Sequence, residues 1–212
     1  MNPYPLGDDG RCALCRLGLN RFDAAYSFGG YEGVLRKLIH LFKYGKVRPL
    51  ARPLGALLAA ALPREERFDA VTPMPLHWLR HWRRGFNQAE LLAREVSRRT
   101  GVPLIKPVRR RRATAPQAGM TNAQRRTNVA GAFAVRGDLT GLRLLLIDDV
   151  ATTGATANAC AAALKRAGAA RVALLTLARV DRRMSISQSA ALPGEAAGNS
   201  WSRIDGEWGS IT

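Results

Sequence analysis

The chain has 212 residues, of which 47% are hydrophobic, and a chain of this length and composition buries one substantial core. Its net charge of +17 favours an anionic partner, either a phosphate-rich ligand or a nucleic acid, over a basic surface that is merely solvated. No apolar run approaches the ~18 residues of a membrane-spanning helix, so we expect no membrane insertion. No signal peptide is visible, and three cysteines do not form a disulfide framework. We therefore expect a cytoplasmic protein.

The first hundred residues predict an alternation of strands and helices. Apolar patterning favours strands at 22–28 and 68–72, the second of which ends at Pro73. Apolar residues at intervals of three or four favour helices, which we expect at residues 31–44, 50–62 and 87–100. The last of these begins at Asn87 and ends at Gly101, and both residue types commonly cap helices.

The middle of the chain is strongly basic. Residues 76–126 contain 13 Lys or Arg against two acids. Residues 102–108 predict an edge strand, because two prolines interrupt its hydrogen-bonding positions. Residues 109–121 have almost no apolar periodicity and predict an exposed loop, which begins with four arginines. We expect this loop to contact nucleic acid through Arg109, Arg110, Arg111 and Arg112.

Aromatic residues within the basic region have two interpretations. Trp78, Trp82 and Phe86 are interleaved with arginines, as in proteins that stack single-stranded bases on aromatic rings. Their i, i+4, i+8 spacing also places all three on one face of a helix, where they would pack into the core. We favour core packing at these positions and assign nucleic-acid contact to the arginine run instead.

Residues 142–179 predict a strand–helix–strand unit. The expected strand at 142–147 is followed by a helix at about 154–167 and a second strand at 171–179. A helical crossover of this length implies that the two strands are parallel, and therefore an α/β fold. From residue 183 onward the chain is rich in Ser, Gly and Ala, and we expect a disordered tail.

Two adjacent acids, Asp148 and Asp149, follow the apolar run of the first of these strands. Ligands of open parallel sheets bind beyond the carboxyl ends of the strands. The segment from Thr152 to Thr156 leads into a helix N-terminus, whose free N–H groups form an anion site. A phosphate cradle beside carboxylates suits a molecule with a phosphate and a diol, such as a ribose 5-phosphate. Helix capping alone explains one of these residues but not the whole set.

The stretch LLLIDDVATTGAT resembles the phosphoribosyl pyrophosphate (PRPP) loop of the type I phosphoribosyltransferases. Within that superfamily, three further segments resemble the ComF family of competence proteins, namely YEGVLRKLIHLFKYG, PMPLHWLRHWRRGFNQAELLA and TAPQAGMTNAQRRTNVAGAF. The resemblance implies an α/β fold with an open parallel sheet flanked by helices over residues 21–180. It also implies a partial zinc-ribbon-like appendage at residues 1–20, and it leaves residues 181–212 as a disordered tail.

The resemblance implies roles for individual residues. Asp148 and Asp149 would meet the ribose hydroxyls, and together with Arg83 they would be the catalytic residues. The residues implied to bind PRPP are Asp148, Asp149, Val150, Ala151, Thr152, Thr153, Gly154, Ala155, Thr156, Pro73, Met74, Pro75 and Arg84. Mg²⁺ would accompany PRPP, and residues 112–117 would belong to a loop that closes over the substrate. Lys43 lies in a matching segment without an assigned role.

Cys12 and Cys15 form a C-x-x-C pair. The family usually carries two such pairs in an N-terminal zinc ribbon, and a structural zinc site usually has four ligands. Two expectations therefore remain open, a Zn²⁺ ion bound through Cys12 and Cys15 or a degraded ribbon without metal. Cys160 lies inside the helix after the PRPP loop and predicts a small core residue.

Family resemblance implies a role in natural transformation, namely the handling of internalised single-stranded DNA, with the DNA-uptake machinery as a further partner. The implied activity is phosphoribosyl transfer, although nothing in the sequence identifies the acceptor. Two alternatives remain open. One is a metabolic phosphoribosyltransferase of nucleobase salvage, and the other is a basic single-stranded nucleic-acid-binding protein with a vestigial PRPP pocket.

Overall fold

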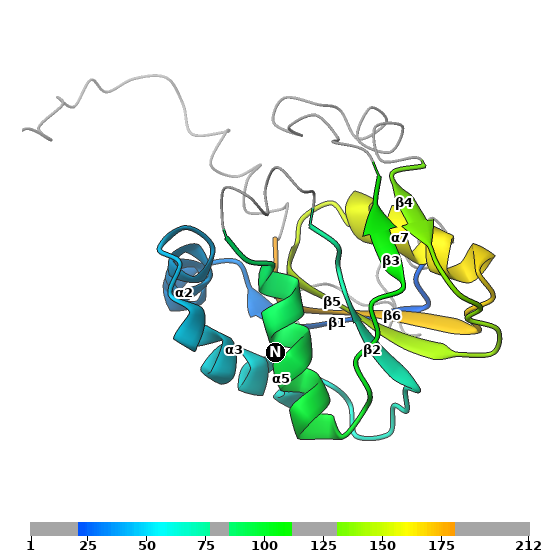
Figure 1. The fold of residues 1–212 in the computed structure, drawn as a ribbon. Helices are drawn as coiled ribbons and strands as arrows, with labels where there is room; N and C mark the ends of the chain where they lie inside the picture. The colour runs from blue at the N-terminus through cyan, green and yellow to red at the C-terminus, as the bar shows by residue number, and fades with distance from the viewer. Residues whose placement is uncertain (1–20, 77–84, 112–130, 181–212) are drawn as a thin grey trace, which may run out of the picture. The chain divides into compact units, whose positions relative to one another are not determined.

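A four-stranded parallel sheet runs through the computed structural model, which describes residues 21–76, 85–111 and 131–180 (Figure 1). In spatial order its strands are β1 (Ala24–Gly30), β6 (Arg171–Arg179), β5 (Arg143–Ala151) and β2 (Ala70–Pro73). Each neighbouring pair is parallel. The carboxyl ends of the strands therefore lie at one edge of the sheet, with β5 and β6 in its centre.

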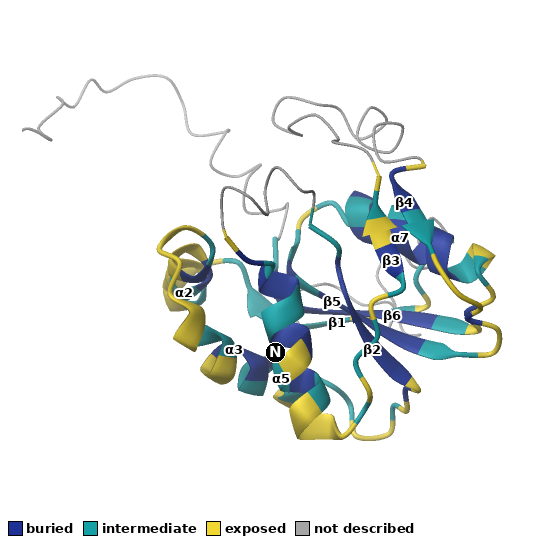
Figure 2. Cartoon of the chain, viewed as in Figure 1, coloured by how far each residue is buried: buried dark blue, intermediate teal, exposed yellow. Residues whose placement is uncertain are grey.

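Helices cover both faces of this sheet. They are α2 (Gly33–Tyr44), the short 3₁₀ helix η1 (Arg48–Leu50), α3 (Ala51–Ala60), α5 (Gln88–Thr100) and α7 (Ala155–Arg166). Side chains alternate along β5, so Leu145 and Ile147 pack with α2, α3 and α5, whereas Leu144 and Leu146 pack with α7. Burial on both faces explains why this strand is a continuous apolar run, and Figure 2 shows the buried centre of the sheet.

A second, two-stranded antiparallel sheet lies on the α7 side. It consists of β3 (Val108–Arg110) and β4 (Phe133–Val135), with Arg110 opposite Phe133. Val108 and Phe133 belong to the same buried cluster as α7. The guanidinium of Arg110 lies 5.6 Å from the centre of the Phe133 ring, which covers part of its charge with an aromatic face.

Local sequence explains where the helices begin and end. The Oδ1 of Asn87 accepts a hydrogen bond from the Ala89 N–H at the start of α5, and Gly101 ends that helix in a left-handed conformation with φ of 74°. In α2, Ile39 and Phe42 are completely buried against the sheet. These two residues anchor the C-terminal half of α2, which reaches the carboxyl edge of the sheet.

The parallel α/β fold and the strands and helices expected before residue 101 are confirmed, with boundaries shifted by at most two residues. The predicted strand at 102–108 is wrong in most of its length. A single parallel bridge joins Leu104 to Val71, and Val108 already belongs to β3. Prolines 103 and 107 have no N–H to donate, which explains why a longer ladder does not form.

The expectation of an exposed loop beginning at Arg109 is also wrong at its start. Arg109 and Arg110 lie in β3, and Arg110 is half-buried, whereas Arg109 and Arg111 are exposed. The reason is pairing with β4, a strand that the sequence pattern did not predict. Periodicity over three residues is too short to distinguish a strand from a loop.

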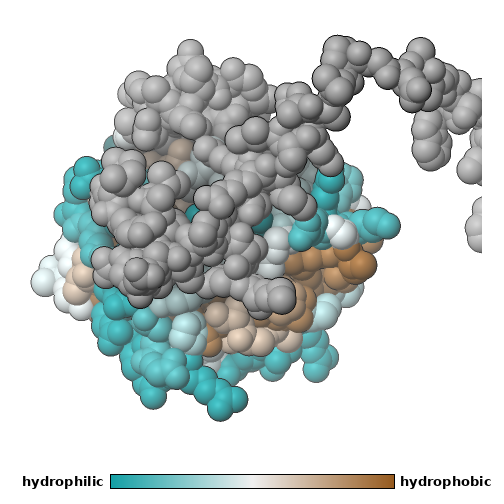
Figure 3. Space-filling model, turned by 180° about the vertical axis from the view of Figure 1, so that it is seen from behind, coloured by the Kyte–Doolittle hydropathy of each residue, from teal (hydrophilic) through white to brown (hydrophobic). Residues whose placement is uncertain are grey.

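Large exposed apolar side chains occur on β1 and α2, where Phe28, Val34 and Leu41 are 43%, 71% and 48% exposed. Seen from behind, apolar and hydrophilic residues share the coloured surface (Figure 3). Among the helices that the structure describes, none combines the length and the apolar character needed to cross a bilayer.

Several predicted features lie outside the described residues. They are the zinc ligands Cys12 and Cys15, the aromatic residues Trp78 and Trp82, the arginines Arg83, Arg84 and Arg112, the closing loop at 112–117 and the tail from residue 181. Phe86 is described, and its ring is buried 5.7 Å from that of Phe42, as core packing predicts.

Candidate functional site

The two adjacent aspartates lie within β5 and not beyond its end. β5 continues to Ala151, and Asp148, Val150 and Ala151 still pair with β6. The expectation that the strand stops at residue 147 is therefore wrong, because hydrogen bonding to the central neighbour β6 continues past the acids. Extended backbone at this position sends the two carboxylates to opposite faces of the sheet.

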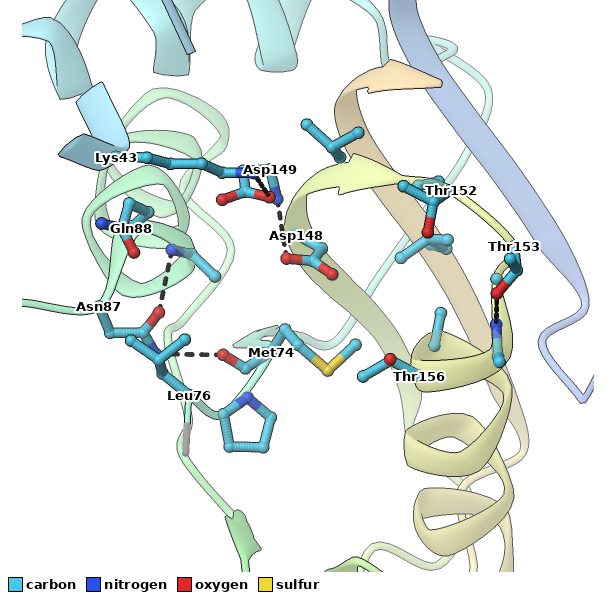
Figure 4. Close-up of a pocket in the computed structure, with 18 of the residues that line it drawn as sticks. Lys43, Met74, Leu76, Asn87, Gln88, Asp148, Asp149, Thr152, Thr153 and Thr156 are labelled. Atoms are coloured by element: carbon cyan, nitrogen blue, oxygen red, sulfur yellow. Dashed lines mark hydrogen bonds and ion pairs between the residues drawn. The ribbon is translucent and has the colours of Figure 1, made fainter. Parts of the chain in front are cut away.

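Asp149 lies on the same face of β5 as Leu145 and Ile147, the face that α2, α3 and α5 cover. Its Oδ1 lies 2.8 Å from the Nζ of Lys43, near the C-terminal end of α2 (Figure 4). The Asp149 and Lys43 side chains are only 13% and 14% exposed. A pair shielded in this way is less screened by water and salt than a surface ion pair.

Asp148 points into the middle of the pocket, on the α7 side of the strand (Figure 4). Its Oδ1 accepts a hydrogen bond of 2.9 Å from the Asp149 N–H. Burial and the negative charge of Asp149 raise the pKa of Asp148 to about 7, and the hydrogen bond and the positive charges of Lys43 and Arg110 only partly oppose them. The two adjacent acids therefore have different chemistry, one held by a cation and the other reluctant to ionise.

The segment after β5 forms the opening of α7. Gly154 has φ of 71°, a conformation that glycine adopts without strain, and it precedes the first helical residue. The Oγ1 of Thr153 accepts a hydrogen bond of 3.2 Å from the Ala155 N–H, while Thr152 is exposed. The remaining N–H groups of the first helical turn and the threonine hydroxyls provide donors for an anion.

The facing wall of the pocket comes from the connection between β2 and α5. The Met74 N–H donates to the Ile147 carbonyl at 2.8 Å, and the Nδ2 of Asn87 donates to the Met74 carbonyl at 3.1 Å. Asn87 therefore ties this wall to the start of α5 while it caps that helix. Pro73 is buried at the end of β2 and does not line the pocket, whereas Met74 and Pro75 do.

These elements enclose a pocket of about 280 Å³. All the predicted residues from Asp148 to Thr156 line it. Residues that the sequence did not assign to PRPP also line it, among them Tyr31, Lys43, Asn87, Gln88 and Arg110. Arg110 was expected at a nucleic-acid surface, yet the β3–β4 pairing brings it to the pocket. No local signal identifies Lys43, because only its contact with Asp149 gives it a role.

The donor set determines how a divalent ion would bind. No group of three or more His, Cys, Asp or Glu that could hold a metal occurs within the described ranges 21–76, 85–111 and 131–180. The pocket offers the two carboxylates of Asp148 and Asp149. Mg²⁺ is commonly bound by one or two carboxylates together with the phosphates of its substrate. The residues therefore fit Mg²⁺ that is shared with a phosphorylated ligand.

Comparison with known proteins identifies close relatives. Residues 83–191 match the model of the phosphoribosyl transferase domain. Competence protein F of Haemophilus influenzae is 33% identical over 79% of this chain and 78% of its own length. DNA utilization protein YhgH of Escherichia coli K12 is 35% identical, over 79% of this chain and 77% of its own. Competence protein ComFC of Bacillus subtilis is 36% identical, over 70% and 61% respectively.

Proposed function

This chain belongs to the ComF family of phosphoribosyltransferase-domain proteins, and from that membership we propose that it binds PRPP together with Mg²⁺ in the pocket at the carboxyl edge of its sheet. The observation that carries the proposal is a single pocket that joins a phosphate cradle to carboxylates. The start of α7 and its threonines suit the 5-phosphate. The carboxylates of Asp148 and Asp149 suit the ribose hydroxyls, which donate hydrogen bonds to them.

Phosphoribosyl transfer breaks the bond between C1 of the ribose and the pyrophosphate oxygen and forms a bond from C1 to an acceptor. Charge develops on C1 and on the leaving group, so binding and electrostatic stabilisation are the main tasks of the protein. Met74 and Pro75 would border the pyrophosphate, and the half-buried Arg110 adds positive charge to the pocket wall. Bound Mg²⁺ would supply further neutralisation of the pyrophosphate charge.

The test is calorimetric titration of PRPP with Mg²⁺. We expect the wild-type chain to release heat of binding, and Asp148→Asn/Asp149→Asn to bind at least about tenfold more weakly, because two acceptors of the ribose hydroxyls are lost. Glu65→Gln, which removes an exposed acid far from these residues in the sequence, serves as the control and should bind like wild type. Equal affinities for wild type and the double variant would exclude this pocket as the PRPP site.

We also propose that the protein acts in natural transformation by handling internalised single-stranded DNA, with the DNA-uptake machinery as a partner. The support is the family, whose members include a competence protein and a DNA utilization protein. The net charge of +17 and the exposed arginines Arg109 and Arg111 suit a polyanion.

Nucleobase salvage is the competing function. Depletion of PRPP in the presence of one of a panel of purine and pyrimidine bases would support it, and would identify the acceptor. No turnover with any base would exclude salvage and leave a binding role for the pocket.

A further inference from the structure

Lys43 is a pocket residue that the domain match does not account for. The match covers residues 83–191, whereas Lys43 comes from α2, in the part of the chain that precedes it. The helix is anchored by the completely buried Ile39 and Phe42, so Lys43 projects from a fixed element. Its Nζ lies 2.8 Å from the Asp149 Oδ1, and both side chains are largely shielded from solvent.

We propose that Lys43 is a positioning residue that acts as the built-in cation of this pocket. Its ammonium group holds Asp149 on the α2 side and takes the place beside that carboxylate that a divalent ion would otherwise occupy. Asp148 points into the middle of the pocket, and Asp149, although its Oδ1 is held by Lys43, keeps a second carboxylate oxygen that can accept from the ligand. The nature of the ligand rests on the proposed function, but the role of Lys43 does not.

Three observations support this assignment. Asp148 and Asp149 point to opposite sides of β5, so they do not converge on one point as a chelating pair would. One of them is already neutralised by an ammonium group at contact distance. No third metal-binding side chain joins them within the part of the chain that the structure describes.

A consequence for the order of binding follows. A free divalent ion would have to displace Lys43 from a shielded carboxylate, and the two like charges would repel each other at short range. An ion that arrives already bound to phosphates needs fewer protein ligands. The metal should therefore enter the pocket together with the phosphorylated ligand and not before it.

The experiment measures binding of Mn²⁺ alone, as a probe for a divalent ion, by electron paramagnetic resonance at pH 8 without any phosphorylated ligand. We expect no tight Mn²⁺ site in the wild-type chain. Lys43→Met should gain one site at least about tenfold tighter, because a positive charge 2.8 Å from the Asp149 carboxylate is removed. Lys43→Arg keeps the charge and should behave like wild type.

Two further variants control the result. Lys37→Met removes an exposed charge from the same helix and should leave Mn²⁺ binding unchanged. Lys43→Met/Asp149→Asn should lose the site that Lys43→Met gains. If Lys43→Met does not fold, as judged by its thermal transition, Lys43→Gln replaces it.

Equal Mn²⁺ affinity in wild type and in the folded Lys43→Met or Lys43→Gln variant would overturn the role of Lys43, as would a tight Mn²⁺ site in the wild type. The proposed function fails separately, if PRPP with Mg²⁺ does not bind the wild-type chain. The Mn²⁺ result still decides the role of Lys43 in that case, because it needs no ligand.

Discussion

Asp148 and Asp149 are neighbours in the chain, yet their surroundings give them different properties. Strand geometry turns Asp149 toward Lys43 and Asp148 toward the pocket. A third residue, Cys160, lies on the α7 side as a completely buried side chain, and burial raises the pKa of its thiol. The prediction that Cys160 is a small core residue is confirmed.

The raised pKa of Asp148 predicts a specific dependence of stability on pH. The folded chain keeps the proton of Asp148 up to a pKa of about 7, whereas the unfolded chain releases it near the ordinary value of 3.8. The unfolded state therefore binds fewer protons between these values, and the contribution of Asp148 to the free energy of unfolding falls as pH rises from about 4 to about 7. Above that window the contribution is constant.

Asp148→Asn removes this titration. We expect urea unfolding to show that wild type loses stability relative to the variant across the window, by a total on the order of 1–3 kcal/mol. The control is Glu65→Gln. The difference in free energy of unfolding between this variant and wild type should not change with pH in the way expected for Asp148→Asn. Parallel stability profiles for wild type and Asp148→Asn would contradict the raised pKa.

At the level of elements, α3 and α5 approach each other closely at Gly55. This glycine is buried in the middle of α3, where helix propensity alone would favour alanine by about 1 kcal/mol. A β-carbon at this position would lie 2.3 Å from the β-carbon of Glu95 on α5. The glycine is therefore needed for helix packing, which in turn positions the α5 wall of the pocket.

Gly55→Ala should destabilise the fold by about 1–3 kcal/mol, because an added methyl group overpacks the contact. Denaturant unfolding measures this change. In a Glu95→Gly background, where the opposing β-carbon is absent, the cost of Gly55→Ala should shrink toward zero. A Gly55→Ala variant more stable than wild type would show that helix propensity outweighs the contact.

For the whole molecule, the charge is distributed over surfaces beyond the pocket. The described chain exposes Arg109 and Arg111 on and after β3, while Arg110 between them is half-buried at the pocket. Because side chains alternate along the strand, Arg109 and Arg111 can contact an external polyanion, whereas Arg110 lines the pocket. The run is therefore two features, which its sequence alone does not distinguish.

Binding of a labelled oligothymidine should weaken steeply as salt concentration rises, since phosphate contacts release counterions. Arg109→Ala/Arg111→Ala should reduce the slope of log affinity against log salt by about two. Arg64→Ala/Arg67→Ala removes two exposed arginines from the loop before β2 and is the charge-matched control. Asp148→Asn should leave DNA affinity unchanged. No binding of the oligonucleotide at low salt would remove the DNA-handling proposal.

Most of the fold and half of the pocket could be predicted from the sequence, because they depend on patterns among residues that are close together in the chain. Apolar periodicity indicates β6 and the helices, and Asn87 and Gly101 indicate the ends of α5. The PRPP-loop motif lies on one strand–helix connection, so its residues remain neighbours in space. β4, the bridge at Leu104 and the true end of β5 could not be predicted, because each depends on a partner strand.

The sequence by itself determined the parallel α/β fold and the stretch from Asp148 to Thr156 as the candidate phosphate and ribose site. Only the tertiary structure decided that Lys43 faces Asp149 and that Arg110 reaches the pocket. The physical reason is distance along the chain. Lys43 and Asp149 are more than a hundred residues apart, and their contact exists only because α2 packs on the face of β5 to which Asp149 points.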